Sequence, residues 1–201
     1  MSGKSNKYHH GDLRRELVSR ARSLINTEGL GKLSLRKLAE EAGVAHTALY
    51  THFPTKDALV AAVLTDGYDR LSQAFGEGVE SRSAPFERLI KAGLIYHEFC
   101  RAEPILFQAM VGPRLNVDGN YQELELALHS AYLFLEEPIT QLSTAPALGL
   151  ATAPAFWASL QGFLGQILSG RIRVRPDREV ALVEQYLHSL SKGFGLNATS
   201  D

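Results

Sequence analysis

The chain has 201 residues, of which 45% are hydrophobic and 21% charged, a composition typical of a globular protein with a sizeable core. The formal net charge is −1, and the single cysteine, Cys100, excludes a disulfide within the chain and fits a reducing compartment. The polar N-terminal residues lack the apolar core of a signal peptide, and no apolar run is long enough to span a bilayer. We therefore expect a cytoplasmic protein with no membrane partner.

Charge is divided unevenly along the chain. Residues 1–65 hold ten Lys and Arg against six Asp and Glu, whereas residues 66–201 hold eleven against sixteen. A basic N-terminal part suggests contact with nucleic-acid phosphates, although chance clustering stays open for so modest an excess. Residues 1–11, which include Lys4 and Lys7, either add contacts of this kind or form a disordered terminus.

Two short helices joined by a tight turn are predicted over residues 34–53. The first carries apolar residues at helical spacing, namely Leu35, Leu38, Ala39 and Ala42. Ser34 is placed to cap its first turn, and Gly43 follows it, where a left-handed backbone conformation is often needed. Val44 and Leu49 anchor the second helix. Such a pair is typical of the DNA-binding helix-turn-helix, but it also occurs in helical proteins that never contact DNA.

The residues that end this motif resemble a known family. The pattern consists of Tyr50, Phe53, Pro54, Lys56, Asp57 and Leu59. It resembles the end of the DNA-binding domain of the tetracycline-repressor (TetR) family, and the whole resemblance covers about residues 9–66. It implies an all-α protein with a three-helix helix-turn-helix head over residues 1–66. The remaining residues, 67–201, would form a larger helical body that binds an effector and dimerises.

Apolar periodicity predicts the other helices. The first helix, capped by Asp12 and ended by Gly29, is expected to bury Leu13, Leu17, Ala21, Leu24 and Ile25. Thr55 is expected to cap a helix over about 56–80. Further helices are predicted over 86–101, 103–112, 121–143 with a kink at Pro138, 156–168 and 177–191, with 144–154 as a connector rich in Ala, Pro and Gly.

The last two helices carry more apolar surface than one small bundle needs. Residues 156–168 are apolar nearly all round, which predicts burial on several sides, and Gly162 and Gly165 would let another backbone approach closely. The last helix is expected to carry Val180, Val183, Leu187 and Leu190 on one face. The resemblance implies that these helices form a homodimer interface; a monomer that buries them completely is the alternative. The segment from Trp157 to Gly162 also resembles the Trp-x-x-x-His-Gly signature of one C-terminal branch, with Gln161 in place of the His.

The resemblance places the DNA contacts on and around the second helix of the motif. The expected residues are Arg36, His46, Thr47, Ala48, Tyr50, Thr51, His52 and Lys56. In the family, residues at the start of this helix face bases, while those matching Tyr50 and Lys56 meet the phosphate backbone. Thr47 offers a hydroxyl and a methyl group, and a neutral His46 donates or accepts, so neither makes a bidentate contact that would specify one base. The family often has Ser or Thr at Ala45, so a helix cap is missing there.

The body offers aromatic and sulfur-containing side chains for an effector site. The candidates are Phe99, Phe107, Met110, Tyr132, Trp157 and Gln161, with Cys100 and Phe134 as further residues of the same kind. Aromatic residues at helical spacing are equally typical of a plain core. The resemblance, in which the body usually binds a small effector, favours a pocket.

Enzyme chemistry finds no support in the sequence. His97-Glu98 lacks the second histidine of a zinc-protease helix, Gly31-Lys32 lacks the remainder of a phosphate loop, and no Gly-x-Ser-x-Gly is present. We expect no metal, no cofactor and no catalytic residue. The prediction is a homodimeric repressor, released from a palindromic double-stranded DNA operator by an unknown small-molecule effector. An activator, or a regulator without a ligand, is the variant within this class. The alternative is a helical small-molecule-binding protein or enzyme that does not bind DNA.

Overall fold

A computed structural model describes residues 10–112, 115, 118–143 and 146–196, and these residues form helices joined by short turns. The head consists of α1 (His10–Glu28), a single 3-10 turn (Leu30–Lys32), α2 (Leu35–Ala42) and α3 (His46–His52). The body holds α5 (Pro85–Ala102), α6 (Pro104–Met110), α7 (Gln122–Leu142), α8 (Pro146–Leu168) and α9 (Pro176–Gly193). The helical architecture predicted from the sequence is confirmed. Of the expected N-terminal arm, residues 1–9 lie outside the described residues.

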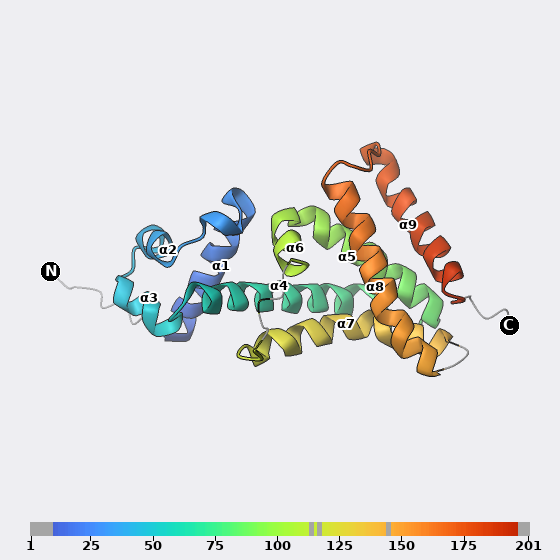
Figure 1. The fold of residues 1–201 in the computed structure, drawn as a ribbon, viewed down its shortest axis with the longest axis horizontal. Coiled ribbons are helices and arrows are strands. Elements are labelled where there is room, and N and C mark those ends of the chain that lie inside the picture. The colour runs from blue at the N-terminus through green and yellow to red at the C-terminus, as the bar shows by residue number, and fades with distance from the viewer. Residues whose placement is uncertain (1–9, 113–114, 116–117, 144–145, 197–201) are drawn as a thin grey trace.

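Helix α4 (Lys56–Gly78) joins the two parts, running from the head along the length of the body (Figure 1). It packs against α1 on the head side and against α5, α6 and α7 on the body side. Its buried side chains change from Leu59 and Val63 in the head to Leu71 and Phe75 in the body. One continuous helix therefore contributes side chains to the core of the head and to the core of the body.

Local signals for helix starts are confirmed at two positions. The Ser34 hydroxyl accepts the Lys37 N–H at 3.1 Å, and the Thr55 hydroxyl accepts the Ala58 N–H at 3.1 Å. The predicted cap at Asp12 is wrong, because α1 begins two residues earlier, at His10. Ala45 precedes α3 and makes no side-chain cap, because alanine has no side-chain oxygen to accept a helix N–H.

The predicted connector over 144–154 is wrong. Helix α8 begins at Pro146 and continues through Pro154. Proline is tolerated at the start of a helix, and the Ala and Leu residues that follow have high helix propensity. Ala153 is fully buried, so packing also stabilises this turn. Helix α7 likewise continues through Pro138, which is buried.

Within the single subunit described, α8 buries one face, which consists of Phe156, Leu160, Leu164 and Ile167. Burial of α8 on several sides requires a partner subunit and stays a prediction. On α9, Val183 and Leu187 are fully buried, but Val180 is 57% exposed. Val180 lies on the side of the buried stripe that is away from the half-buried Leu182 and Tyr186.

Among the described residues, no helix is both long and apolar enough to cross a membrane.

Candidate nucleic-acid interface

A turn centred on Gly43 sets the angle between α2 and α3. Gly43 adopts a left-handed conformation, with φ 66° and ψ 30°, which costs glycine no steric strain. Its N–H donates to the Glu40 carbonyl at 3.2 Å, and the Val44 N–H donates to the Ala39 carbonyl at 3.0 Å. These bonds satisfy carbonyls at the end of α2 and fix the direction in which the chain leaves it. The sequence therefore folds locally into the predicted helix-turn-helix.

Helix α3 has one buried face and one open face. Leu49 and Phe53 are buried at 0% and 1% exposure and attach the helix to the head core. Four of the predicted DNA contacts, His46, Thr47, Tyr50 and Thr51, are exposed. Because these residues are either adjacent in the sequence or four positions apart, they lie on one side of the helix, opposite Leu49. The open side of α3 consequently presents the Thr47 and Tyr50 hydroxyls and the His46 imidazole to a base edge or a phosphate, whereas the Thr51 hydroxyl donates to the Thr47 carbonyl at 2.9 Å.

The other four predicted contacts differ in accessibility. Lys56 is exposed at the first position of α4, whereas Ala48 and His52 are half-buried. Arg36 is exposed, but its Nε donates to Oε1 of Glu40 on the same helix at 2.9 Å. Any contact between Arg36 and a phosphate would compete with this surface ion pair, which is weak in water.

The head is held rigid by contacts that use some of its basic residues. The Arg14 guanidinium lies over the Phe53 ring, 5.5 Å from its centroid. Lys37 in α2 pairs with Glu28 at the end of α1. The hydrogen bond from Lys37 lowers the pKa of the Glu28 carboxyl, and the same bond raises the pKa of Lys37. Lys37 therefore ties α1 to α2.

A cluster at the junction of head and body joins α1, α4 and the turn before α6. Glu103 is only 8% exposed, and its carboxylate accepts a hydrogen bond from Asn26 Nδ2 at 3.0 Å. Arg70 in α4 pairs with the same carboxylate, and Arg22 Nε lies 3.8 Å from its Oε2. Arg22 also pairs with Asp66 at 2.8 Å. We call these five residues the junction cluster. The sequence analysis did not predict this cluster. The available sequence signal was an acidic residue, Glu103, directly before Pro104, where α6 begins.

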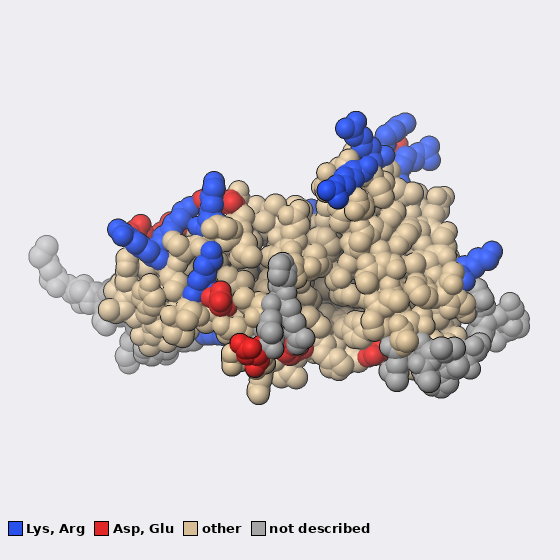
Figure 2. Space-filling view, viewed as in Figure 1, with Lys and Arg blue, Asp and Glu red and all other residues tan. Residues whose placement is uncertain are grey.

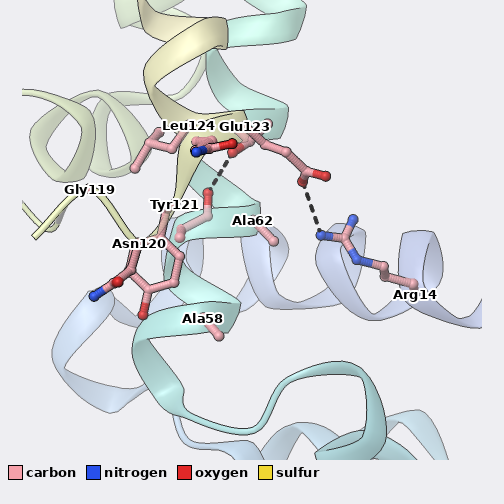
Figure 3. A pocket seen from close by; sticks show the side chains of 11 residues that line it. Arg14, Ala58, Ala62, Gly119, Asn120, Tyr121, Glu123 and Leu124 are labelled. Atoms are coloured by element: carbon pink, nitrogen blue, oxygen red, sulfur yellow. Dashed lines mark hydrogen bonds and ion pairs between the residues drawn. The ribbon is translucent and has the colours of Figure 1, made fainter.

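A cavity of about 340 Å³ lies between head and body, and Figure 3 shows the side chains that line it. Arg14 from α1, Ala58 and Ala62 from α4, and the residues leading into α7 line it. Arg14 Nη2 lies 3.5 Å from Oε2 of Glu123 across its mouth. Both partners are well exposed, so this ion pair contributes little to holding the head in place.

The predicted effector residues converge on a tyrosine that was not among them. The rings of Trp157 and Tyr96 stack with centroids 4.8 Å apart, and Phe107 meets Tyr96 edge-on at 5.8 Å. Tyr132 meets Trp157 edge-on at 5.9 Å, and Gln161 Nε2 donates to the Tyr96 hydroxyl at 3.2 Å. We call Tyr96, Phe107, Tyr132, Trp157 and Gln161 the aromatic cluster. A tyrosine inside the apolar pattern of 86–101 was the signal that could have identified Tyr96.

The remaining candidates lie in different surroundings. Phe99 is 9% exposed on α5, and the Met110 sulfur lies against Gly67, where a Cβ would come within 3.1 Å. The ring centroids of Phe134 and of Phe75 in α4 lie 5.1 Å apart. Burial raises the pKa of the Cys100 thiol well above its ordinary value, so this buried cysteine is a protonated core residue. Burial also raises the pKa of Tyr132 to about 12, with the Glu136 charge adding to the effect.

His97, which the sequence offers beside Glu98, contacts a carboxylate of α9. Its Nε2 lies 2.7 Å from Oε1 of Glu179 in α9, and Arg101 Nε lies 3.2 Å from the same oxygen. His97 and Glu179 are each 7% exposed. The contact pins α9 to α5. No group of three or more His, Cys, Asp or Glu suited to a metal occurs among the residues the structure describes.

Comparison with known proteins finds relatives of the helix-turn-helix head. Residues 17–63 match the family described as "Bacterial regulatory proteins, tetR family". The transcriptional repressor KstR2 of Mycolicibacterium smegmatis is 32% identical over 76 residues, which are 38% of this chain and 37% of that protein. The alignment thus spans little more than a third of that relative's length.

Solved structures resemble nearly the whole chain. A protein of unknown function from Rhodococcus sp. RHA1 aligns with a TM-score of 0.74 at 27% identity, covering 95% of this chain and 97% of that one. BioQ bound to its double-stranded DNA operator aligns with a TM-score of 0.67 at 17% identity, covering 95% and 100%. At that identity the second likeness shows the fold alone.

Proposed function

We propose that this chain, whose residues 17–63 form a TetR-family N-terminal domain, is a non-enzymatic DNA-binding transcription regulator. It would act as a homodimeric repressor that leaves a palindromic operator when a small molecule binds its body. The observation that carries the proposal is the open face of α3, where His46, Thr47, Tyr50 and Thr51 are exposed above a rigid core. A protein acting on the chromosome works in the cytoplasm of a bacterium, which we propose as its location.

The division of labour follows the two parts of the fold. We propose that residues 1–66 bind DNA and that residues 67–201 bind the effector and dimerise. Within the head, His46 and Thr47 would read base edges, whereas Tyr50, Lys56 and Arg36 would meet phosphates, with Ala48, Thr51 and His52 completing the contact surface. Selection of bound fragments from random DNA tests this directly. An enriched palindrome with half-sites about one helical turn, roughly 34–36 Å, apart is expected; no enrichment at low salt overturns the proposal.

Homodimerisation through α8 and α9 is supported by the face they leave open. Phe163 and Tyr186 stack with centroids 3.8 Å apart, joining the two helices, and both remain half-buried. A Cβ built on Gly162 or Gly165 meets no atom within 4 Å, so another subunit has room to approach. The segment from Trp157 to Gly162 keeps its likeness to the Trp-His-Gly branch, and membership in that branch is part of the proposal.

A substitution on this face separates packing within the subunit from dimerisation. Gly162→Leu fits the isolated subunit, because the added side chain points into open space, but it would obstruct a partner. The matched control is Gly76→Leu, an exposed helical glycine in α4 with the same open surroundings. Light scattering should find the first variant monomeric and the second dimeric. Two dimeric variants would contradict an interface at Gly162.

The effector site proposed here is the aromatic cluster, with Phe99 and Met110, which follow Tyr96 and Phe107 by three residues on α5 and α6, as further candidates. A ligand that enters it must separate Trp157 from Tyr96. The chain contains one tryptophan, so the emission of Trp157 reports this event without interference. A screen of small apolar compounds should identify one that changes the Trp157 emission and releases DNA, with both effects half complete at the same compound concentration. A compound that releases DNA with no change in emission would place the effector elsewhere.

Release of DNA would follow from the position of α4. A ligand can shift the equilibrium between two head spacings only by binding one of them more tightly. The junction cluster, which fixes α1 to α4 and the start of α6, is the connection through which such a preference would reach α3.

A further inference from the structure

A concentration of arginine at the turn between α8 and α9 lies outside every site described above. Residues 170–178 hold four arginines and one aspartate, whereas the rest of 66–201 holds seven Lys and Arg against fifteen Asp and Glu. Figure 2 shows Lys and Arg gathered over this turn, apart from those over the head and projecting from the same long edge of the molecule. The turn is thus strongly basic on an otherwise acidic body.

The turn presents its charges in a fixed order. Arg171, Arg173 and Arg175 are exposed, while Ile172 and Val174 between them are half-buried and pack against the core. We call the three arginines the arginine ridge. Residues 171 and 172 form a bend, whereas Arg175 has an extended backbone. The ridge therefore offers three exposed guanidinium groups within five residues of one turn.

The backbone of the turn is well anchored. Gly170 adopts φ 71°, and its N–H donates to the Ile167 carbonyl at 2.9 Å. The Ile172 N–H donates to the Gln166 carbonyl at 3.0 Å. These bonds, together with the packing of Ile172 and Val174, order the ridge before any partner arrives, so less conformational entropy is lost on binding.

Two of the three guanidinium groups have no acidic partner in the described part of the chain. Arg175 makes a bidentate pair with Asp177, with both N–O distances 3.0 Å. Arg171 and Arg173 have no hydrogen bond or ion pair to described residues. An unpaired, ordered row of arginines repels itself, and an extended anion would relieve that repulsion.

Resting on the proposed function, we propose that the arginine ridge is a second DNA contact, which binds duplex phosphates without reading sequence. A membrane surface fits less well, because the apolar residues of the turn face inward and leave no side chain to insert. A protein partner would need an apolar anchor that the ridge does not expose. The ridge projects from the same long edge of the molecule as Lys and Arg of the head (Figure 2), so a duplex that extends along this edge is the polyanion we assign to it.

The test is the salt dependence of DNA binding by the full-length protein. Each neutralised phosphate contributes about 0.9 to the slope of log affinity against log salt. The double variant Arg171→Gln/Arg173→Gln removes four charges from the dimer, and its slope should be shallower by about 2 to 4 on a duplex carrying the selected palindrome. The control is Arg82→Gln/Lys91→Gln, which removes the same charge from exposed positions elsewhere on the body and should keep the original slope.

The outcomes separate this inference from the proposed function. If the unchanged protein binds DNA and both double variants share its slope, or flatten it by the same amount, the ridge contact is wrong and the DNA-binding function stands. If the unchanged protein binds no duplex at low salt, both are wrong. If Arg171→Gln/Arg173→Gln becomes monomeric by light scattering while the control stays dimeric, the arginines are subunit contacts, which also overturns the proposal.

Discussion

Asn26 in the head donates a hydrogen bond from Nδ2 to Oε2 of Glu103, 3.0 Å away and 77 residues later in the chain. The Asn26 side-chain oxygen in turn accepts the Leu106 N–H of α6 at 3.2 Å. One amide thus satisfies a buried carboxylate and the first turn of α6 together. The head is tied to the body by this amide as well as by the continuity of α4.

Removal of the Glu103 carboxylate should destabilise the protein. Glu103→Ala leaves Arg22, Arg70 and Asn26 without their shared partner, and the free energy of unfolding should fall by about 2 kcal/mol, less than for a fully buried pair because both arginines are partly exposed. Glu103→Gln should cost less, since its amide oxygen still accepts from Asn26. Urea unfolding measures both.

The matched control for this experiment is Glu98→Ala on the neighbouring α5. Glu98 is exposed, so its removal should change the free energy of unfolding by no more than about 0.5 kcal/mol. Equal effects of Glu103→Ala and Glu98→Ala would show that the junction cluster contributes nothing to stability.

Contacts to the DNA backbone and to bases should respond differently to substitution. Tyr50→Ala and Lys56→Gln should weaken binding to all sequences, and Lys56→Gln should make the salt slope shallower by about 1 for each phosphate that Lys56 neutralises. Thr47→Ala should mainly change the preferred base at one position of the half-site. Fluorescence anisotropy on a panel of singly substituted operators measures all three. Identical profiles for the three variants would refute the division into backbone and base contacts.

A cap added before α3 should stabilise the head. Ala45 has the extended backbone of a capping residue, φ −64° and ψ 139°, but no oxygen to accept a helix N–H. Ala45→Ser should raise the free energy of unfolding by about 1 kcal/mol, read from chemical denaturation. Ala102→Ser, at the exposed C-terminal end of α5, offers no cap and serves as the control. A gain of the same size in the control would point to some cause other than capping.

The charge of Asp69 should make stability depend on pH. Asp69 is exposed on α4, but partial desolvation raises the pKa of its carboxyl, and the neighbouring charges of Asp66 and Glu123 raise it further. The folded chain therefore binds more protons than the unfolded chain between the ordinary pKa, 3.8, and the raised one. Stability is lost as the pH rises through that window. Asp69→Asn removes the unfavourable charge and should stabilise the protein at pH 7 by about 0.3 kcal/mol, a value typical of like-charge pairs on a helix.

Well below pH 3.8, the ordinary pKa, Asp69 is protonated in the folded and the unfolded chain alike, so the advantage of Asp69→Asn should vanish there. Glu184→Gln, an exposed position on α9, is the control and should show no such trend. A gain from Asp69→Asn that stays constant down to acid pH would mean that the charge of Asp69 is not its cause.

Features determined by neighbours in the sequence were predictable from it. The caps at Ser34 and Thr55, the left-handed turn at Gly43 and the burial of Leu49 each depend on a few adjacent residues and on helical periodicity. For the same reason the order of the helices followed from the pattern of apolar residues. The error at 146–154 arose where two such signals conflict, since Pro and Gly oppose the helix that Ala and Leu favour.

Only the tertiary structure decided which distant side chains meet. Glu103 finds Asn26 and Arg70, His97 finds Glu179, and Tyr96 gathers the aromatic cluster around it. None of these pairings leaves a trace in local periodicity, because a partner far along the chain is brought near by the packing of whole helices. The arginine ridge depends on the sequence and on the tertiary structure together. The sequence alternates Arg with Ile and Val. The packing of Ile172 and Val174 against the core then leaves the arginines facing outward.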